Sequence, residues 1–184
     1  ISVMLIGIVS LGGITPEHQV RQFLISVTYL MAISLILTGG LQLYFTRFIS
    51  DRLYEQKAAV ILPNLLGILG LVTVATGCIG SLLVLLLFEE SLLFCVLLVT
   101  NLVVLCNLWM VIIFLSGMKA YNRILLTLLV GYAVMIGCGF VLRDFNLEGL
   151  LLALLIGHAS LVFMFLFEIL REYPSDRLIG FDMG

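Results

Sequence analysis

The residues of this sequence best suited to chemistry are uncharged polar side chains that stand inside apolar runs. They comprise three amides, a hydroxyl, an indole and an imidazole: Gln42, Thr100, Asn101, Asn107, Trp109 and His158. Such groups form hydrogen bonds without carrying a permanent charge. In a chain that crosses a bilayer they either join helices or line the path of a polar substrate.

We expect these six residues to line a polar path, because so many uncharged polar groups cannot easily satisfy their hydrogen bonds by pairing with one another. Thr100 and Asn107 are seven residues apart and therefore share one helix face. Ser34 and Thr38 precede Gln42 in the same run and add further hydrogen-bonding groups. The alternative for each residue is a structural hydrogen bond to a neighbouring helix.

Motifs for catalysis and metal binding are absent from the sequence. It contains no phosphate-binding G-x-x-x-x-G-K-[ST], no G-x-G-x-x-G and no H-E-x-x-H. His18 and His158 lie on different segments, without Cys or carboxylate at ligand spacing. The four Cys residues stand in apolar runs and form no C-x-x-C pair. We therefore predict neither an enzyme nor a bound metal or cofactor.

The composition indicates that most of the surface faces lipid. Hydrophobic residues make up 62% of the chain and charged residues only 11%, with a mean hydropathy of +1.27. A soluble domain carries about a quarter charged residues. The formal net charge of −2 gives no reason to expect a nucleic-acid partner.

Polar breaks divide the chain into six apolar stretches, which we predict to be transmembrane helices. They are residues 1–13, 23–45, 58–88, 92–116, 124–142 and 150–170. The first is too short to cross about 30 Å of hydrocarbon, so we expect its beginning to lie outside a sequence that is part of a longer protein. The predicted fold is an all-α polytopic bundle in which residues 1–184 form one lobe.

Two of the stretches have features of their own. We expect Pro63-Asn64 to break or bend the third stretch near its beginning. Small residues then recur at spacings of three and four, which predicts close packing against another helix. They are Gly67, Gly70, Thr73, Gly77 and Gly80. Residues 46–57 read as a helical extension whose Arg47, Arg52 and Lys57 contact anionic lipid or a partner protein.

The distribution of Lys and Arg predicts the orientation. Seven of the nine lie in alternate connections: Arg47, Arg52, Lys57, Lys119, Arg123, Arg171 and Arg177. Arg21 and Arg143 lie in the opposite connections. By the positive-inside rule, residues 46–57, 117–123 and 171–184 are cytoplasmic in a multi-pass protein of the bacterial inner membrane. Glu168 stands near this end, and the middle of each complete span lacks a charged residue.

Several stretches resemble the PelG family, the membrane transporter subunit of the Pel exopolysaccharide system. They are residues 22–55, 61–67, 111–126, 145–163 and 169–183. Polar loop residues match as well as leucines, and REYPSDR is the most distinctive segment. The resemblance implies membership of the multidrug, oligosaccharide-lipid and polysaccharide (MOP) flippase superfamily, with about twelve spans in two lobes.

The same resemblance implies a function and partners. It implies export of a cationic, amino-sugar-rich polysaccharide across the inner membrane for biofilm formation, beside a cytoplasmic glycosyltransferase and other membrane subunits. Two alternatives stay open. One is a small-molecule antiporter of the same superfamily, although such a protein usually needs an intramembrane carboxylate. The other is a membrane scaffold that holds a glycosyltransferase and transports nothing.

Overall fold

The computed structural model describes residues 17–56, 60–87, 91–117, 121–142 and 145–172. The helices are α2 (Glu17–Tyr54), α3 (Ile61–Leu87), α4 (Leu92–Gly117), α5 (Tyr121–Leu142) and α6 (Asn146–Glu172). Each is long and apolar enough to cross a membrane, and no strand occurs within these ranges. The prediction of an all-α polytopic bundle is confirmed. The stretch at residues 1–13 lies outside the described residues, as does Lys57.

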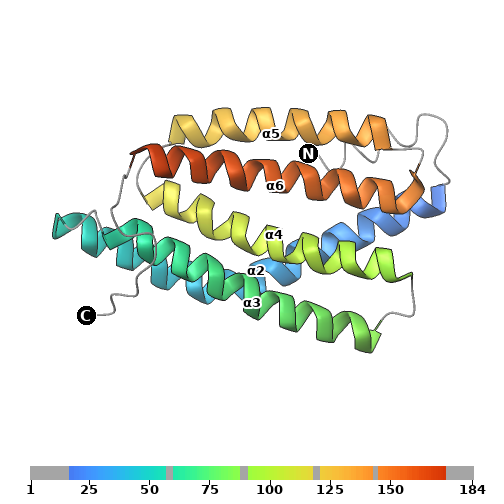
Figure 1. Ribbon diagram of the computed structural model, residues 1–184, viewed down its shortest axis with the longest axis horizontal. Coiled ribbons are helices and arrows are strands. Elements are labelled where there is room, and N and C mark those ends of the chain that lie inside the picture. The colour runs from blue at the N-terminus through green and yellow to red at the C-terminus, as the bar shows by residue number, and fades with distance from the viewer. Residues whose placement is uncertain (1–16, 57–59, 88–90, 118–120, 143–144, 173–184) are drawn as a thin grey trace.

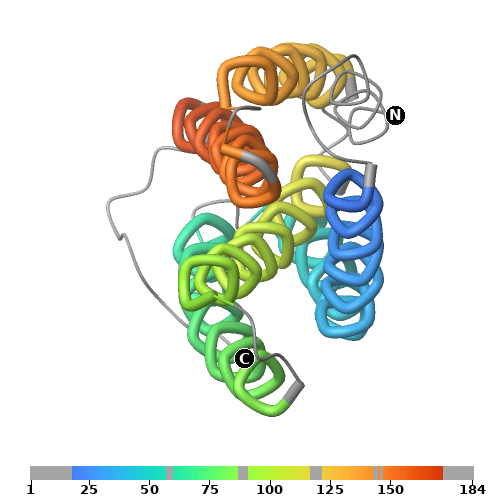
Figure 2. The backbone as a smooth tube through the Cα atoms, turned by 90° about the vertical axis from the view of Figure 1, so that its right-hand side faces the viewer, coloured from blue at the N-terminus to red at the C-terminus, as the bar shows by residue number. Residues whose placement is uncertain are grey.

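Helix α4 forms the centre of the bundle (Figure 1). It packs against α2, α3 and α6, while α5 packs mainly against α6. Consecutive helices α2 and α3 have little mutual contact, and each packs on α4 instead. The end-on view in Figure 2 shows α4 with the other helices arranged around it. Half of the most apolar part of α4 is buried, against 22% for α2, α3 and α5, so α4 serves as the common packing surface.

The alternating helix directions collect the basic residues at one end of the bundle. The end of α2, the beginning of α3, the end of α4, the beginning of α5 and the end of α6 lie together at the left of Figure 1. Arg52, Arg123 and Arg171 belong to these terminal turns. We call this the basic end. At the opposite end, the Ser91 hydroxyl donates to Glu148 Oε1 at 2.7 Å and accepts from the Phe94 N–H at 3.2 Å, which caps α4.

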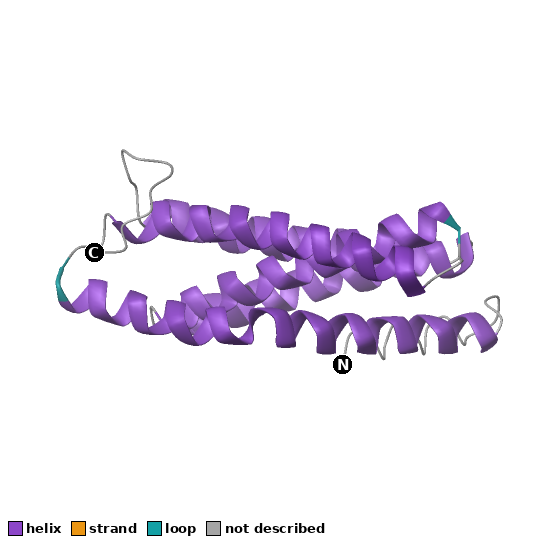
Figure 3. Cartoon of the chain, turned by 90° about the horizontal axis from the view of Figure 1, so that it is seen from below, coloured by secondary structure: helices purple, strands orange, loops and turns teal. Residues whose placement is uncertain are grey.

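Helix α2 is longer than a bilayer requires. Its 38 residues extend over about 57 Å at 1.5 Å per residue, against about 30 Å of hydrocarbon. Figure 3 shows it as a continuous helix along one side of the bundle. The helical extension predicted after residue 45 is therefore present as far as Tyr54. A turn follows, in which Gln56 has a φ of 58°.

Pro63 does not bend a longer helix, which corrects one expectation. Helix α3 begins at Ile61, so Pro63 lies in its first turn. The first N–H groups of a helix have no intrahelical partner, and a proline there removes nothing. The Asn64 side chain donates to the Val60 carbonyl at 2.8 Å, which fixes the same turn.

Close helix packing occurs at some of the small residues and not at others. A Cβ atom on Gly80 would lie 3.1 Å from Leu102 Cδ2 of α4, whereas one on Gly70 would meet nothing within 4 Å. The predicted stripe on α3 is therefore in contact only in part. Helices α5 and α6 approach more closely. A Cβ on Gly149 would overlap the Leu142 carbonyl oxygen, and one on Gly157 would lie 2.5 Å from the Cβ of Met135.

We expect Gly157→Ala to lower the free energy of unfolding by about 1–2 kcal/mol. Overpacking costs about 1–3 kcal/mol, and the better helix propensity of Ala offsets part of it. Gly137→Ala on α5 is the matched control, because a Cβ there meets nothing within 4 Å. Thermal unfolding of the detergent-purified protein measures both. Equal stability of the two variants would contradict the described packing of α5 on α6.

Candidate functional site

A chain of hydrogen bonds joins α2 to the central helix α4. The indole Nε1 of Trp109 donates to the Ser34 hydroxyl at 3.0 Å, and that hydroxyl donates to the Met31 carbonyl at 2.9 Å. One turn further along α2, Thr38 donates to the Ser34 carbonyl and accepts from the Gln42 amide, both at 2.7 Å. Ser34 and Thr38 are fully buried. Trp109 and Gln42, two of the predicted site residues, thus belong to one network.

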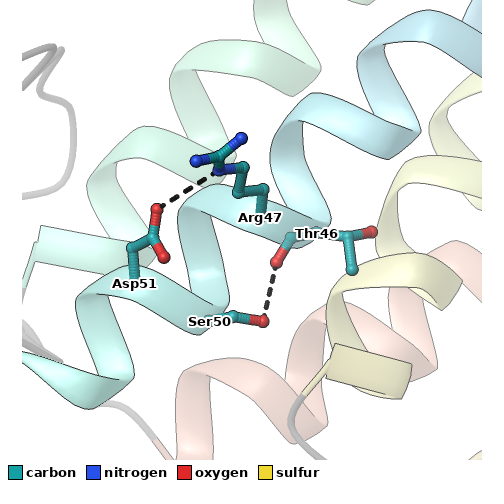
Figure 4. Close-up of polar contacts among 4 residues, drawn as sticks. All are labelled: Thr46, Arg47, Ser50 and Asp51. Carbon is teal, nitrogen blue, oxygen red and sulfur yellow. Dashed lines mark hydrogen bonds and ion pairs between the residues drawn. The ribbon is translucent and has the colours of Figure 1, made fainter.

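The network continues along α2 as a polar ladder with a step of four residues. Its members are Ser34, Thr38, Gln42, Thr46 and Ser50. Each step of four residues turns about 40° beyond a full helical turn, so these groups form one stripe that winds gradually around α2. Thr46 donates to the Gln42 carbonyl at 2.7 Å and Ser50 to the Thr46 carbonyl at 3.0 Å, as Figure 4 shows for the last step. The stripe is buried in mid-bundle and exposed near the basic end.

The ladder has a defined hydrogen-bonding character. Each hydroxyl group of the ladder donates a hydrogen bond to a main-chain carbonyl of α2. The Ser34 and Thr38 oxygens already accept from Trp109 and Gln42, whereas the Thr46 and Ser50 oxygens stay available as acceptors. At the exposed members, Thr46 and Ser50, these acceptors face away from the helix axis and can receive hydrogen bonds from hydroxyl or ammonium groups.

Two Asn residues of α4 connect to other neighbours. Asn107 Nδ2 donates to the Thr73 hydroxyl of α3 and to the Val103 carbonyl, both at 2.9 Å. Asn101 Nδ2 donates to the Leu97 carbonyl at 2.8 Å and to the Leu151 carbonyl of α6 at 3.1 Å. In both residues the Oδ1 atom is buried without a hydrogen-bond partner. Each Asn thus bridges two helices and retains an unused acceptor.

The remaining predicted residues make local contacts. Thr100 donates to the Val96 carbonyl of its own helix at 2.7 Å. His158 is 2% exposed, and its Nδ1 lies 3.0 Å from the Leu154 carbonyl one turn back on α6.

The structure therefore distributes four of the six predicted residues over three interfaces of α4, while Thr100 and His158 bond within their own helices. Trp109 and Gln42 belong to the α2 side, Asn107 to the α3 side and Asn101 to the α6 side. Sequence reasoning did not single out Thr46 and Ser50. The signal that identifies them is the recurrence of hydroxyl and amide residues at every fourth position of one helix.

The extension at the end of α2 has an amphipathic surface. Arg52 forms an ion pair with Glu55 at 2.8 Å, and its guanidinium carbon lies 5.4 Å from the centre of the Phe48 ring. Arg47 lies 3.9 Å from Asp51 and is 87% exposed (Figure 4). Exposed ion pairs of this kind contribute little to stability. Contact of Arg47 and Arg52 with lipid or a partner stays a prediction.

The described residues do not assemble a reactive centre. Within these ranges no group of three or more His, Cys, Asp and Glu side chains could hold a metal ion. The polar groups described above are amides, hydroxyls and an indole that bond to helix carbonyls or to one another. Such groups can bind a ligand through hydrogen bonds.

Comparison with known proteins gives one match. Residues 1–184 match the sequence model of the PelG family, described as "Putative exopolysaccharide Exporter (EPS-E)". No curated protein and no solved structure matches the chain. The family match covers the connections as well as the apolar helices, so it depends on more than general hydrophobicity.

We expect the bond between Trp109 and Ser34 to couple α4 to α2 by about 0.6–1.7 kcal/mol, the range measured for interhelical hydrogen bonds in membrane proteins. A double-mutant cycle with Trp109→Phe and Ser34→Ala isolates this term. The readout is the free energy of unfolding in bicelles. Strict additivity of the two substitutions would show that the bond does not join the helices.

Proposed function

This chain belongs to the PelG family of exopolysaccharide exporters, and from that membership we propose that it translocates the cationic, amino-sugar-rich Pel polymer across the inner membrane. The direction is from cytoplasm to periplasm, and the product is matrix polysaccharide for biofilms. The observation that carries this proposal is the polar ladder on α2. It begins buried in mid-bundle and ends near the basic end with two exposed acceptors, Thr46 and Ser50.

The chemistry of the ladder suits a sugar polymer. Hydroxyl and ammonium groups of an amino sugar are hydrogen-bond donors. The exposed oxygens of the ladder can accept from them, because the protons of these hydroxyls already point to helix carbonyls. Each neutral hydrogen bond contributes only about 1 kcal/mol net. A row of weak, equivalent sites holds a moving polymer without trapping it, because passage requires binding that is easily reversed.

The exposed part of the ladder marks the cytoplasmic entrance of the proposed path. Thr46 and Ser50 are exposed, and Gln42 is half-buried. Since the extension after residue 45 is predicted to be cytoplasmic, the two exposed acceptors face water at this entrance. A second six-helix lobe opposite α2 would form the other wall of the path, and relative rocking of two lobes would provide alternating access.

The partners follow from the same assignment. A cytoplasmic glycosyltransferase would deliver the growing chain to the basic end, and other membrane subunits would complete the complex. The extension of α2 beyond the bilayer provides a surface for such contacts, with Arg47 and Arg52 exposed or half-buried on it. Positively charged helix ends also favour the cytoplasmic leaflet, which supports a cytoplasmic location of the basic end.

The antiporter alternative has less support among the described residues. An ion-coupled carrier usually holds a carboxylate within the membrane. Glu168 is the described carboxylate deepest within a helix of the basic end. It stands four residues before the end of α6 and lies 3.9 Å from Arg123. Its position near the end of the span favours a surface ion pair over a coupling site.

The ladder predicts a specific secretion defect. Thr46→Val with Ser50→Ala removes two exposed acceptors without altering helix packing, so we expect the amount of secreted polymer to fall about fivefold for each lost hydrogen bond. Gln42→Leu should have a similar effect. Secretion is measured in a strain whose only copy of the gene carries the substitution, with membrane protein level monitored by immunoblot.

Thr28→Val is the matched control for this experiment. Thr28 is an exposed α2 hydroxyl that makes the same type of bond, to the Leu24 carbonyl at 2.8 Å, but stands outside the ladder. Secretion by this variant should equal that of the unmodified protein. If ladder and control variants secreted equally well, the path would have to lie elsewhere.

The orientation is open to a direct test. We expect a single Cys introduced at Arg47 to react with a membrane-impermeant maleimide only after the cells are opened, because the basic end is cytoplasmic. A Cys introduced at His18, at the other end of α2, should react in cells whose outer membrane alone is permeable. The reverse pattern would contradict the direction of transport.

A further inference from the structure

A pocket with charged walls lies between α5 and α6 at the basic end. Its volume is about 560 Å³, and its lining comprises Arg123, Leu126, Thr127, Glu168 and Arg171. Residues four apart on α5 face residues three apart on α6, so each helix contributes one pair of polar side chains. The ladder on α2 does not contribute to this pocket.

Thr127 provides the first sign that the pocket is made for a ligand. Other Thr residues within the helices donate to the carbonyl one turn back, for example Thr28, Thr38, Thr76 and Thr100. The Thr127 hydroxyl makes no such bond among the described residues, and it is not one of the fully enclosed polar atoms without a partner. Since Thr127 lines the pocket, its hydroxyl can bond to a ligand there.

The charges of the pocket favour an anion. Two guanidinium groups, Arg123 and Arg171, line it together with a single carboxylate. That carboxylate, Glu168, lies 3.9 Å from Arg123 Nη1 and partly neutralises it. The pocket thus keeps a net positive charge, with Arg171 and the Thr127 hydroxyl as the donors best placed for an anion's oxygens. Arginine and hydroxyl donors together are typical of phosphate recognition.

The apolar surroundings indicate the source of the phosphate. Leu126 belongs to the pocket wall and is 68% exposed. Leu125 and Leu129 on the same stretch of α5 are 63% and 65% exposed. These side chains continue from the charged pocket toward mid-membrane along the outer face of the bundle. A cationic pocket at the membrane surface above an exposed apolar strip matches an anionic headgroup above acyl chains.

We propose that this pocket binds the phosphate of an anionic phospholipid of the membrane leaflet at the basic end. Arg171 and Thr127 bind the phosphate oxygens, Glu168 orients Arg123 at the rim, and the acyl chains follow the leucines of α5. The site would fix the α5–α6 pair at the membrane surface. This inference does not depend on the exporter assignment, because it uses none of the residues of the ladder.

The test is native mass spectrometry of the detergent-purified full-length protein with phosphatidylglycerol, phosphatidylcholine and inorganic phosphate as separate probes. We expect phosphatidylglycerol to bind about tenfold more tightly than phosphatidylcholine, and inorganic phosphate not to displace it. Arg171→Gln should weaken phosphatidylglycerol binding about tenfold, as expected for loss of a charge-assisted hydrogen bond. Thr127→Val preserves side-chain shape and should weaken it about fivefold.

Arg21→Gln is the matched control, because it removes an exposed arginine near the opposite end of the bundle that lies outside the pocket. It should leave lipid binding unchanged. Equal phosphatidylglycerol affinity in the unmodified protein, Arg171→Gln and Thr127→Val would overturn the proposal. Displacement of the lipid by inorganic phosphate at comparable affinity would overturn the assignment of the lipid as its source.

Discussion

The structure depends on one constraint: hydrocarbon supplies no hydrogen-bonding partner, so every polar group within a span must find one inside the protein. This explains why the backbone is helical throughout the described spans. It also explains why Thr38, Thr46 and Thr76 each donate to a carbonyl one turn back. Where a side chain has more capacity than its neighbours can use, as in Asn101 and Asn107, an acceptor is left over.

The fold class was predictable because apolar length and polar breaks are properties of the sequence itself. The five stretches beginning at residues 23, 58, 92, 124 and 150 each fall largely within one helix. The central position of α4 was not predictable in the same way. It depends on how the helices rotate about their axes, and an evenly apolar sequence such as that of α4 carries little information about rotation. The place of Pro63 in the first turn of α3 was not predictable, because apolar length alone does not mark the residue at which a helix begins.

The polar residues were predictable as a set, and their partners were not. The sequence does not show whether Asn107 faces α2, α3 or α6. The packing of α4 determines that its partner is Thr73 of α3. The ladder on α2 is different, because its spacing of four is visible in the sequence. The pocket between α5 and α6 combines residues more than 40 positions apart, so no local sequence pattern predicts it.

The direction of the hydrogens on α2 has a consequence for selectivity. A surface whose hydroxyl protons all point back into its own helix presents lone pairs and withholds donors. A glycan rich in carboxylates also presents lone pairs, and such a surface would repel it. Along the proposed path, a glycan rich in amino groups would find an acceptor at each exposed hydroxyl. Discrimination between acidic and basic polysaccharides would then depend in part on where the hydroxyl protons point.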